Sequence, residues 1–458
     1  MNSIAKRTYF AMALACVLLF GLATFLVRYV LYAGEWVTYP GSPHVYSTSG
    51  SLNIGTVTDR SGTVLLDTTD GRDYAKDATV RKATVHLLGD REGNIPSVIL
   101  NRYAEKLVGF DLLNGTYSLA QGQGACELTI SAQVQSIALQ ALNGRKGTVG
   151  VYNYKTGEIL CAVSSPTYDP DNVPDIANDT TGAYDGAYVN RFFNTSYTPG
   201  SIFKILTTAA AIETIPDIDE QTFTCNGTVI VGGETITCEG VHNSISFKDA
   251  FAHSCNCAYA DISTQLGAKT LTKYTEQAGV MDSLTVDGLH TAEGNFDLSD
   301  DSANNVAWAG IGQHLDMINP CQYMTFMGAI ANGGTAAEPY LVASARCGTD
   351  SRYTADTKMT DRVMQTSTAA KLEEMMAYNV QNVYGAWNFP SVKVCAKSGT
   401  AETGAGQTPN AMFAGFVADE EYPLAFIVVV ENGGSGSAVA GPIAGTVLQA
   451  CINVMDAE

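Results

Sequence analysis

The distribution of hydrophobic and polar residues divides the chain into three parts. Residues 8–27 form an uninterrupted run of 20 positions without a charge, which is enough to cross a hydrocarbon core about 30 Å thick as a helix. Residues 32–124 are rich in Gly, Thr, Ser and Asp and hold only short β-like runs. The pattern therefore predicts a cytoplasmic tip and anchor at 1–31, a small, mostly β module at 32–124 and a larger domain at 125–458.

The larger domain is predicted to have strands at both ends and helices in the middle. Ser131 opens an amphipathic helix for which Gly144 is the expected stop. Apolar runs predict two strands at 148–154 and 158–163, separated by a short glycine-containing loop typical of a hairpin. Further strand-like runs lie near the end, at 392–396, 412–418 and 424–431. This order predicts one mixed α/β domain whose sheet is built from the two ends of the segment, with helices on its faces.

Charge narrows the range of partners and orients the anchor. The chain has 46 acidic and 26 basic residues and a formal net charge of -20, which argues against nucleic acid because phosphate binding requires clustered Lys and Arg. Lys6 and Arg7 precede the apolar run, and a positive flank stays on the cytoplasmic side, so we expect everything after Arg28 to lie outside the cell membrane. The alternative is a cleaved signal peptide. The run is long for one and no small-x-small site follows it closely, so an uncleaved anchor is favoured.

The cysteines do not form an obvious disulfide or metal framework. There are 11 of them, an odd number for an exported protein. Cys225 and Cys238 flank a Gly-rich, hairpin-like stretch and could pair. No Cys/His spacing indicates a zinc site, because Cys255 and Cys257 lie close together in one helix-like run and the histidines are scattered. We expect neither a metal nor a cofactor.

The first candidate for chemistry is a serine followed by a lysine three residues later. Ser201 and Lys204 lie at the start of a strongly apolar helix, so they share one face and can touch. A serine is a poor nucleophile unless a base takes its proton, and a lysine can serve when an apolar setting lowers its pKa. Alone, the pair is weak evidence, because a capping serine beside a solvated lysine has the same spacing.

Two further groups of residues strengthen the case. Ser254 and Asn256 offer a hydroxyl and an amide two positions apart at the start of another helical run. Near the end of a strand, Lys397 and Thr400 offer an ammonium and a hydroxyl, while Gly399 lets a substrate backbone approach closely. In this order, on helix, helix and strand, the motifs resemble those of the serine penicillin-recognising transpeptidases and β-lactamases.

The resemblance extends to class B penicillin-binding proteins over most of residues 50–458. It implies a transpeptidase/β-lactamase-like domain in which helices cover an antiparallel sheet. A small pedestal or dimerisation-like module and one transmembrane helix would precede this domain. The other similar segments are 59–62, 155–160, 165–170, 190–192, 197–201, 310–313 and 319–320.

The resemblance also implies a role for each motif residue. Ser201 would be the acylated nucleophile and Lys204 its base, while Ser254 would relay a proton toward the leaving group. Asn256 would hold Lys204 and the substrate amide, and Lys397 would support Ser254 electrostatically.

The strand motif and the backbone would bind the substrate. Ser398, which stands where Thr is commoner, Gly399 and Thr400 would line the substrate site, with Thr400 binding the carboxylate. The backbone amides of Ser201 and Thr400 would form the oxyanion hole.

The implied activity is a peptidoglycan D,D-transpeptidase that cross-links stem peptides ending in D-Ala-D-Ala and is acylated by β-lactams. A D,D-carboxypeptidase, a β-lactamase and a β-lactam-sensing receptor are the alternatives. Only 7 residues precede the apolar run, which leaves little room for a signalling domain. No glycosyltransferase is recognisable, so we expect a separate membrane glycan polymerase of the shape, elongation, division and sporulation type as a partner.

Overall fold

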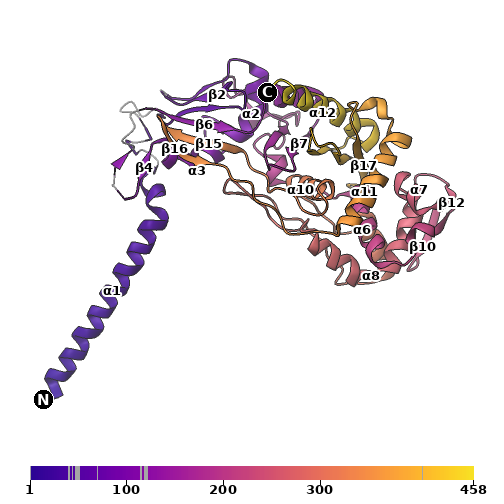
Figure 1. Ribbon diagram of the computed structural model, residues 1–458, viewed down its shortest axis with the longest axis horizontal. Coiled ribbons are helices and arrows are strands. Elements are labelled where there is room, and N and C mark those ends of the chain that lie inside the picture. The colour runs from indigo at the N-terminus through magenta and orange to yellow at the C-terminus, as the bar shows by residue number, and fades with distance from the viewer. Residues whose placement is uncertain are drawn as a thin grey trace.

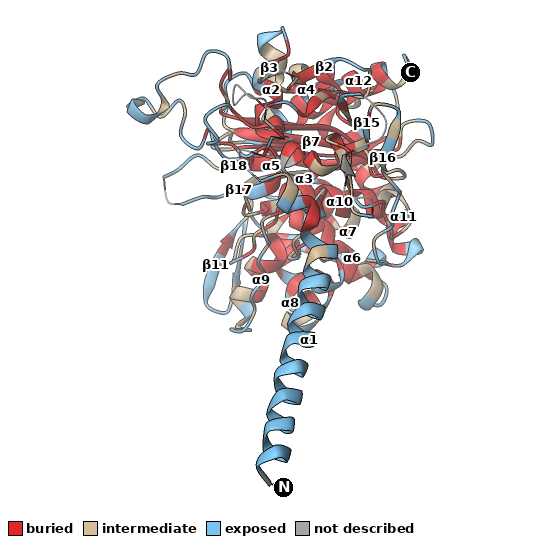
Figure 2. Ribbon diagram, turned by 90° about the vertical axis from the view of Figure 1, so that its left-hand side faces the viewer, coloured by how far each residue is buried: buried red, intermediate tan, exposed pale blue. Residues whose placement is uncertain are grey.

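The computed structural model describes residues 2–39, 42–43, 45–46, 52–69, 71–113, 116–117, 122–404 and 406–458. Its first element, helix α1 (Asn2–Val37), projects as a single rod from the rest of the protein (Figure 1). The 18-residue apolar window of the candidate span Ser3–Val37 is 0% buried, and Figure 2 shows α1 exposed until it meets the rest of the protein, where Ala33 is buried. A second apolar helical stretch, Gly436–Met455, is 61% buried and belongs to the core. The exposed helix α1 fits a membrane anchor.

The N-terminal module is built on a six-stranded sheet with the order β16-β15-β6-β1-β2-β3. Four of these strands come from the module and its border: β1 (Gly55–Thr58), β2 (Val64–Asp67), β3 (Asp73–Tyr74) and β6 (Gly124–Leu128). The other two, β15 (Val342–Cys347) and β16 (Asp350–Thr354), come from far along the chain. The domain division at residue 124 stays a prediction, and the sheet draws strands from both sides of it.

Helices were not expected in the module, and its described part contains two. They are α2 (Ala78–Leu88) and α3 (Val98–Leu107), and a short β4–β5 pair follows at Phe110–Asp111 and Thr116–Tyr117. Asp77 caps α2 by accepting bonds from the Thr79 and Val80 amides, and Ser97 caps α3. The polar composition of this region concealed two short helices that depend on side-chain caps.

The C-terminal domain contains the predicted antiparallel sheet. Its order is β17-β18-β19-β7-β8, so strands from the two ends of the domain pair at β19 and β7, as expected. Their bounds are β7 Gly147–Asn153, β8 Ile159–Ser165, β17 Val394–Ala401, β18 Asn410–Val417 and β19 Leu424–Val430. The fold class predicted from the sequence is confirmed.

Both faces of this sheet are buried. Val149 and Val151 of β7 join an apolar cluster with α4 (Ala132–Leu142) and α12 (Gly441–Met455). Tyr152 at the end of β7 and Tyr154 beyond it join the larger core on the other face, where α10 (Pro320–Ala331) contacts β18 and β19. Covering on both faces explains why the strands read as continuous apolar runs.

Among the remaining elements, α6, α7, α8, β10 and β12 lie together beyond α10 and α11 (Figure 1), whereas α5 contacts β7 and β8 of the sheet. The helices are α5 Arg191–Asn194, α6 Lys204–Thr214, α7 Phe247–Ala252, α8 Asn256–Gln277, α9 Ala303–Ile311 and α11 Thr366–Asn379. The short strands are β9 Thr222–Cys225, β10 Thr228–Val231, β11 Glu234–Thr237, β12 Asn243–Ser246, β13 Thr285–Val286 and β14 Leu289–His290. Helix α11 packs on the edge strand β17.

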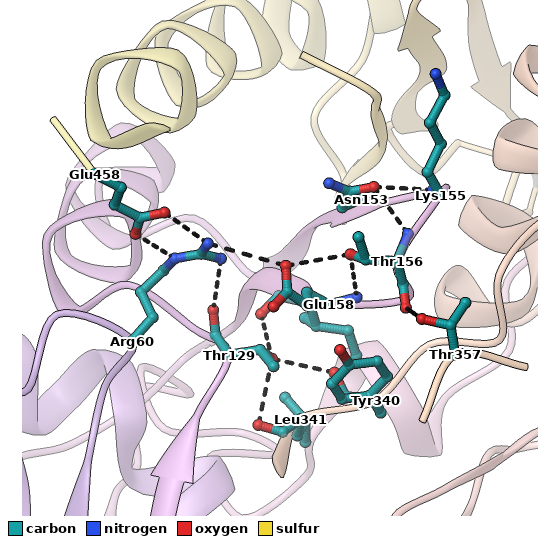
Figure 3. Close-up of polar contacts among 11 residues, drawn as sticks. Arg60, Thr129, Asn153, Lys155, Thr156, Glu158, Tyr340, Leu341, Thr357 and Glu458 are labelled. Atoms are coloured by element: carbon teal, nitrogen blue, oxygen red, sulfur yellow. Dashed lines mark hydrogen bonds and ion pairs between the residues drawn. The ribbon is translucent and has the colours of Figure 1, made fainter. Parts of the chain in front are cut away.

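A polar junction connects the module to the C-terminal domain (Figure 3). Arg60, in the turn between β1 and β2, donates to both carboxylate oxygens of Glu458, at 2.5 and 2.8 Å. It also donates to the Thr129 carbonyl at 3.3 Å and lies 3.9 Å from the Glu158 carboxylate. The side chain of Arg60 is only 16% exposed, so this fork joins the β1–β2 turn to both ends of the C-terminal domain.

Candidate active site

Ser201 lies in a tight turn where three segments of the backbone meet. The 3-10 turn Gly200–Phe203 runs directly into α6, so the predicted position at the start of an apolar helix is correct. Gly200 has φ +54°, and a Cβ there would lie 2.7 Å from the Thr400 carbonyl oxygen. Its amide donates to the Gly312 carbonyl at 2.9 Å. Only glycine fits between these neighbours, and the turn thereby presents Ser201 to the end of β17.

The Lys204 ammonium is surrounded by oxygen atoms of the first two motifs. Its Nζ lies 3.2 Å from Ser201 Oγ and 3.1 Å from Ser254 Oγ. It also donates to the Ser254 carbonyl and to Asn256 Oδ1, both at 2.7 Å. Lys204 is 0% exposed. The structure thus brings together the four residues Ser201, Lys204, Ser254 and Asn256, which the sequence placed on separate segments.

Burial sets the protonation of this lysine. Desolvation lowers the pKa of Lys204 to about 8, and the negative charge of Cys238 partly opposes the shift. At this pKa a sizeable fraction of the amine is neutral near pH 7 to 8, and a neutral amine has a lone pair that can accept a proton. The face of the Tyr259 ring, 5.3 Å from Nζ, closes the apolar side of the pocket.

Ser254 adopts a backbone conformation that the sequence did not indicate. It was expected at the start of a helix, but it lies between α7 and α8 with φ +56°. A non-glycine residue in this region carries a conformational cost of about 1–3 kcal/mol and occurs preferentially at functional sites. Asn256 begins α8, and its Nδ2 donates to the Thr237 carbonyl at 2.8 Å. The conformation at Ser254 directs both its hydroxyl and its carbonyl at Lys204.

The strand motif is in place, although two of its residues make unexpected contacts. Lys397 is 0% exposed, and its Nζ donates to the Ser398 carbonyl at 3.0 Å rather than to Ser254. Burial, and then the charge of Lys204, hold the pKa of Lys397 well below its usual value. The Ser398 hydroxyl donates to the Tyr384 hydroxyl at 3.1 Å, which turns it toward the core. Lys397 and Lys204 thus lie close enough for each charge to disfavour the other, and the Ser398 side chain is engaged by Tyr384.

The packing of the protein itself requires a small residue at Gly399. A Cβ at this position would lie 3.0 Å from the Pro199 carbonyl oxygen and 3.0 Å from Ile202. These contacts show β17 packed against the turn that carries Ser201, and a role for Gly399 in substrate approach stays a prediction. This packing fixes the distance between Ser201 and β17.

A cleft of about 160 Å³ opens at Ser201. Among the described residues, its walls are Ser201, Thr237, Cys238, Glu239, Asn256, Trp308, Ile311, Gln313, Thr400 and Glu402. Sequence reasoning missed Glu239, Trp308 and Glu402 as wall residues because nothing in their local pattern marks them. Gln313 could have been found, since it belongs to the similar segment 310–313. Its Nε2 contacts the Thr400 carbonyl at 3.5 Å.

The expectation about cysteines and histidines needs correction. Cys225 and Cys238 are free thiols in the structure, so their suggested pairing is not seen. Instead, ligand atoms of Cys225, Cys238, His242 and Cys255 all lie within 4.8 Å of one another. Their spacing contains no short Cys-x-x-Cys unit, and the folding of β9 onto β12 brings the ends of the segment together. A one-dimensional spacing rule could not detect this group.

The fold and the site together define a class. A helical layer that carries a buried Ser–Lys pair against a five-stranded antiparallel sheet is the arrangement of serine penicillin-recognising acyltransferases. The chain belongs to the penicillin-binding protein transpeptidase family, because the family described as "Penicillin binding protein transpeptidase domain" matches residues 147–449. Its features are those of a class B penicillin-binding protein, as the sequence predicted.

Curated relatives support this assignment over most of the chain. The chain is 31% identical over 386 residues to the peptidoglycan D,D-transpeptidase PbpA of Mycobacterium tuberculosis, which covers 77% of this chain and 78% of the relative. It is 28% identical over 228 residues to the stage V sporulation protein D of Bacillus subtilis, with 47% of this chain and 34% of that protein covered.

Solved structures agree with the sequence relatives. The penicillin G acyl-enzyme complex of penicillin-binding protein A from M. tuberculosis matches with a TM-score of 0.75 and 26% identity, covering 87% of this chain and 99% of that one. The D,D-transpeptidase domain of a peptidoglycan glycosyltransferase from Eggerthella lenta matches with a TM-score of 0.75 and 25% identity, covering 87% and 98%.

Proposed function

We propose that this protein is a peptidoglycan D,D-transpeptidase that acts through an acyl-enzyme on Ser201. The observation that carries the proposal is the contact of Lys204 Nζ with Ser201 Oγ at 3.2 Å. Lys204 is fully buried, and this burial lowers its pKa. A serine is activated when a neutral base lies within reach of its proton. Curated relatives of the chain are named peptidoglycan D,D-transpeptidases, which supports the same chemistry.

The first half-reaction forms the acyl-enzyme. Neutral Lys204 takes the hydroxyl proton of Ser201 while Ser201 Oγ bonds to the carbonyl carbon between the two D-alanines. The backbone amides of Ser201 and Thr400 stabilise the negative oxygen of the tetrahedral intermediate. Ser254, 3.1 Å from Lys204, passes the proton to the leaving nitrogen, the carbon–nitrogen bond breaks, and D-alanine departs.

The second half-reaction transfers the acyl group. An amine of a second stem peptide attacks the ester carbon and loses a proton to Lys204 through Ser254. The new carbon–nitrogen bond forms while the bond to Ser201 Oγ breaks, and the proton returns to Ser201. Penicillin enters the first half-reaction in the same way, but its opened ring stays attached and blocks the amine.

The site operates at the membrane surface in this proposal. Lys6 and Arg7 hold the start of α1 on the cytoplasmic side, so the catalytic domain faces the cell wall. Family analogy supports a membrane glycan polymerase of the shape, elongation, division and sporulation type as the partner that supplies uncross-linked strands.

The test uses the full-length chain purified in detergent and labelled with a fluorescent penicillin. We expect one stable adduct, which peptide mapping places on Ser201, and no adduct in Ser201→Ala. Ser61→Ala serves as the matched control, because Ser61 is an exposed serine in the β1–β2 turn of the N-terminal module, and it should label normally. An adduct on another residue would refute the assignment of the nucleophile.

A second measurement separates the related activities. With a D-Ala-D-Ala stem peptide and an amine acceptor, a transpeptidase yields the cross-linked product in excess over the hydrolysed one. Hydrolysis alone would identify a D,D-carboxypeptidase. Rapid loss of the penicillin label would identify a β-lactamase.

A further inference from the structure

Three thiols and one imidazole converge beside the candidate active site. Cys225, Cys238, His242 and Cys255 each direct one ligand atom into a group less than 4.8 Å across. Cys225 and Cys255 are buried, and the other two are partly buried. Three cysteines and one histidine form one of the usual ligand sets of structural zinc.

The distances within the group suit a tetrahedral metal. Zinc lies about 2.3 Å from sulfur and about 2.05 Å from nitrogen, so ideal tetrahedral ligands are separated by about 3.8 Å for two sulfurs and about 3.6 Å for sulfur and nitrogen. The Sγ atoms of Cys238 and Cys255 are 3.9 Å apart, and Cys238 Sγ is 3.6 Å from His242 Nδ1. We propose that Cys225, Cys238, His242 and Cys255 bind one Zn²⁺ ion through three thiolates and Nδ1.

The surroundings explain why a metal would be needed here. Cys225 ends β9, Cys238 follows β11, His242 precedes β12 and Cys255 caps α8. Strands β9 and β12 form an isolated two-stranded pair, as do β10 and β11. Two-stranded ribbons of this size are marginally stable in water, and the side chains of β10 alternate between exposed and partly buried. One ion would fasten both ribbons to the start of α8.

The proposed zinc site is continuous with the candidate active site. Cys255 lies between Ser254 and Asn256, and Cys238 lines the cleft. The Asn256 amide donates to Cys238 Sγ at 3.3 Å, and the Ala258 amide donates to Cys255 Sγ at 3.5 Å. Such N–H···S bonds orient thiolate ligands in metal sites.

The ion would therefore position catalytic groups without touching the substrate. It would hold Ser254 in its left-handed conformation and keep the Thr237 carbonyl opposite Asn256. This positioning role rests on the proposed function, whereas the binding of zinc does not.

The test measures metal in the full-length chain purified in detergent without added chelator. We expect about one zinc per chain by elemental mass spectrometry. After exchange to Co²⁺, we expect the sulfur-to-cobalt charge-transfer bands and the intense d–d bands of a tetrahedral thiolate site. Cys225→Ser should weaken zinc binding by more than the roughly 10- to 100-fold that loss of an outer-shell partner costs.

Two controls keep the result interpretable if Cys225→Ser folds poorly. Cys347→Ala removes a buried thiol in β15, far from the group, and should retain full zinc. His242→Cys keeps four ligands, so it should retain metal while its Co²⁺ spectrum moves toward that of an all-thiolate site. A zinc-free protein with reduced thiols and no tetrahedral Co²⁺ spectrum would overturn the proposal, and so would a Cys238–Cys255 disulfide in freshly purified protein.

Activity is measured separately from metal content. Removal of zinc by a chelator should slow penicillin acylation at least tenfold, and added Zn²⁺ should restore it. Unchanged acylation by protein shown to be metal-free would refute the positioning role while leaving zinc binding and the proposed transpeptidase intact.

Discussion

Replacement of Asn256 by alanine removes one acceptor from the Lys204 ammonium. The bond from Nζ to Asn256 Oδ1 is 2.7 Å long, and Lys204 itself is 0% exposed. A hydrogen bond to a charged group is worth about 1.5–3 kcal/mol, and each pKa unit corresponds to about 1.4 kcal/mol. Loss of the bond destabilises the charged form only, so the pKa of Lys204 should fall from about 8 by roughly 1 to 2 units.

The sign of the effect on activity follows from the role of the base. Acylation requires neutral Lys204, so its rate rises with pH through the pKa of Lys204. In Asn256→Ala the midpoint should move to lower pH. The acylation rate at the high-pH plateau should fall about tenfold or more, because a lysine of lower pKa is a weaker base and is also less firmly held.

Asn256→Asp is the matched partner of this variant. Both changes remove the Nδ2 donor to the Thr237 carbonyl, but aspartate adds a negative charge beside Nζ and should raise the pKa of Lys204. The assay is the second-order rate constant for labelling by fluorescent penicillin between pH 5.5 and 9.5. If the midpoints of the two variants move in the same direction, or if neither moves, then Lys204 is not the group whose deprotonation controls acylation.

Three other changes test separate parts of the site. Lys204→Arg should acylate very slowly although it keeps the charge, because arginine does not give up its proton at working pH; normal labelling would assign the base elsewhere. Thr400→Val should slow acylation by penicillin and by a D-Ala-D-Ala ester roughly ten- to a hundredfold, with much less effect on a substrate whose carboxylate is amidated; equal losses would refute a carboxylate-binding role. Gly312→Ala should lower the melting temperature and the labelling rate, since its Cβ would lie 2.2 Å from the Gly200 carbonyl oxygen at φ +87°. Gly144→Ala is the control, because Gly144 has a similar φ of +75° but open space around it. If both variants lost the same amount, backbone strain alone would explain the loss in Gly312→Ala.

The sequence was sufficient where local pattern and tertiary packing agree. The helix that Ser131 opens was predicted to stop at Gly144; its last residue is Leu142, and Asn143, just before that glycine, adopts the left-handed conformation. The central strands were visible because both faces of their sheet are buried. The helix that follows Ser201 was visible because nearly all of it lies in the core.

The sequence was insufficient where geometry depends on residues distant in the chain. The left-handed Ser254 contacts Lys204 of α6 through its carbonyl and its hydroxyl, and nothing in its sequence neighbours indicates this conformation. Strands β15 and β16 have mixed burial; β15 pairs with β6 from the first part of the chain, and β16 pairs with β15. The convergence of Cys225, Cys238, His242 and Cys255 likewise arises only after β9 has paired with β12.

Because the six-stranded sheet contains strands from both parts of the chain, the two parts cannot be exchanged independently between related proteins. Strand β15 pairs with β6 from Leu128 back to Gly124, and β6 in turn pairs with β1. A chain that started after Leu128 would leave β15 as an open edge, with unpaired amides and carbonyls that invite association with other chains. It would also expose Val342 and Ala345, which are 0% accessible in the intact protein. The N-terminal module is therefore not an exchangeable cassette, and a functional chimera would have to take residues 342–354 from the same parent as residues 55–128.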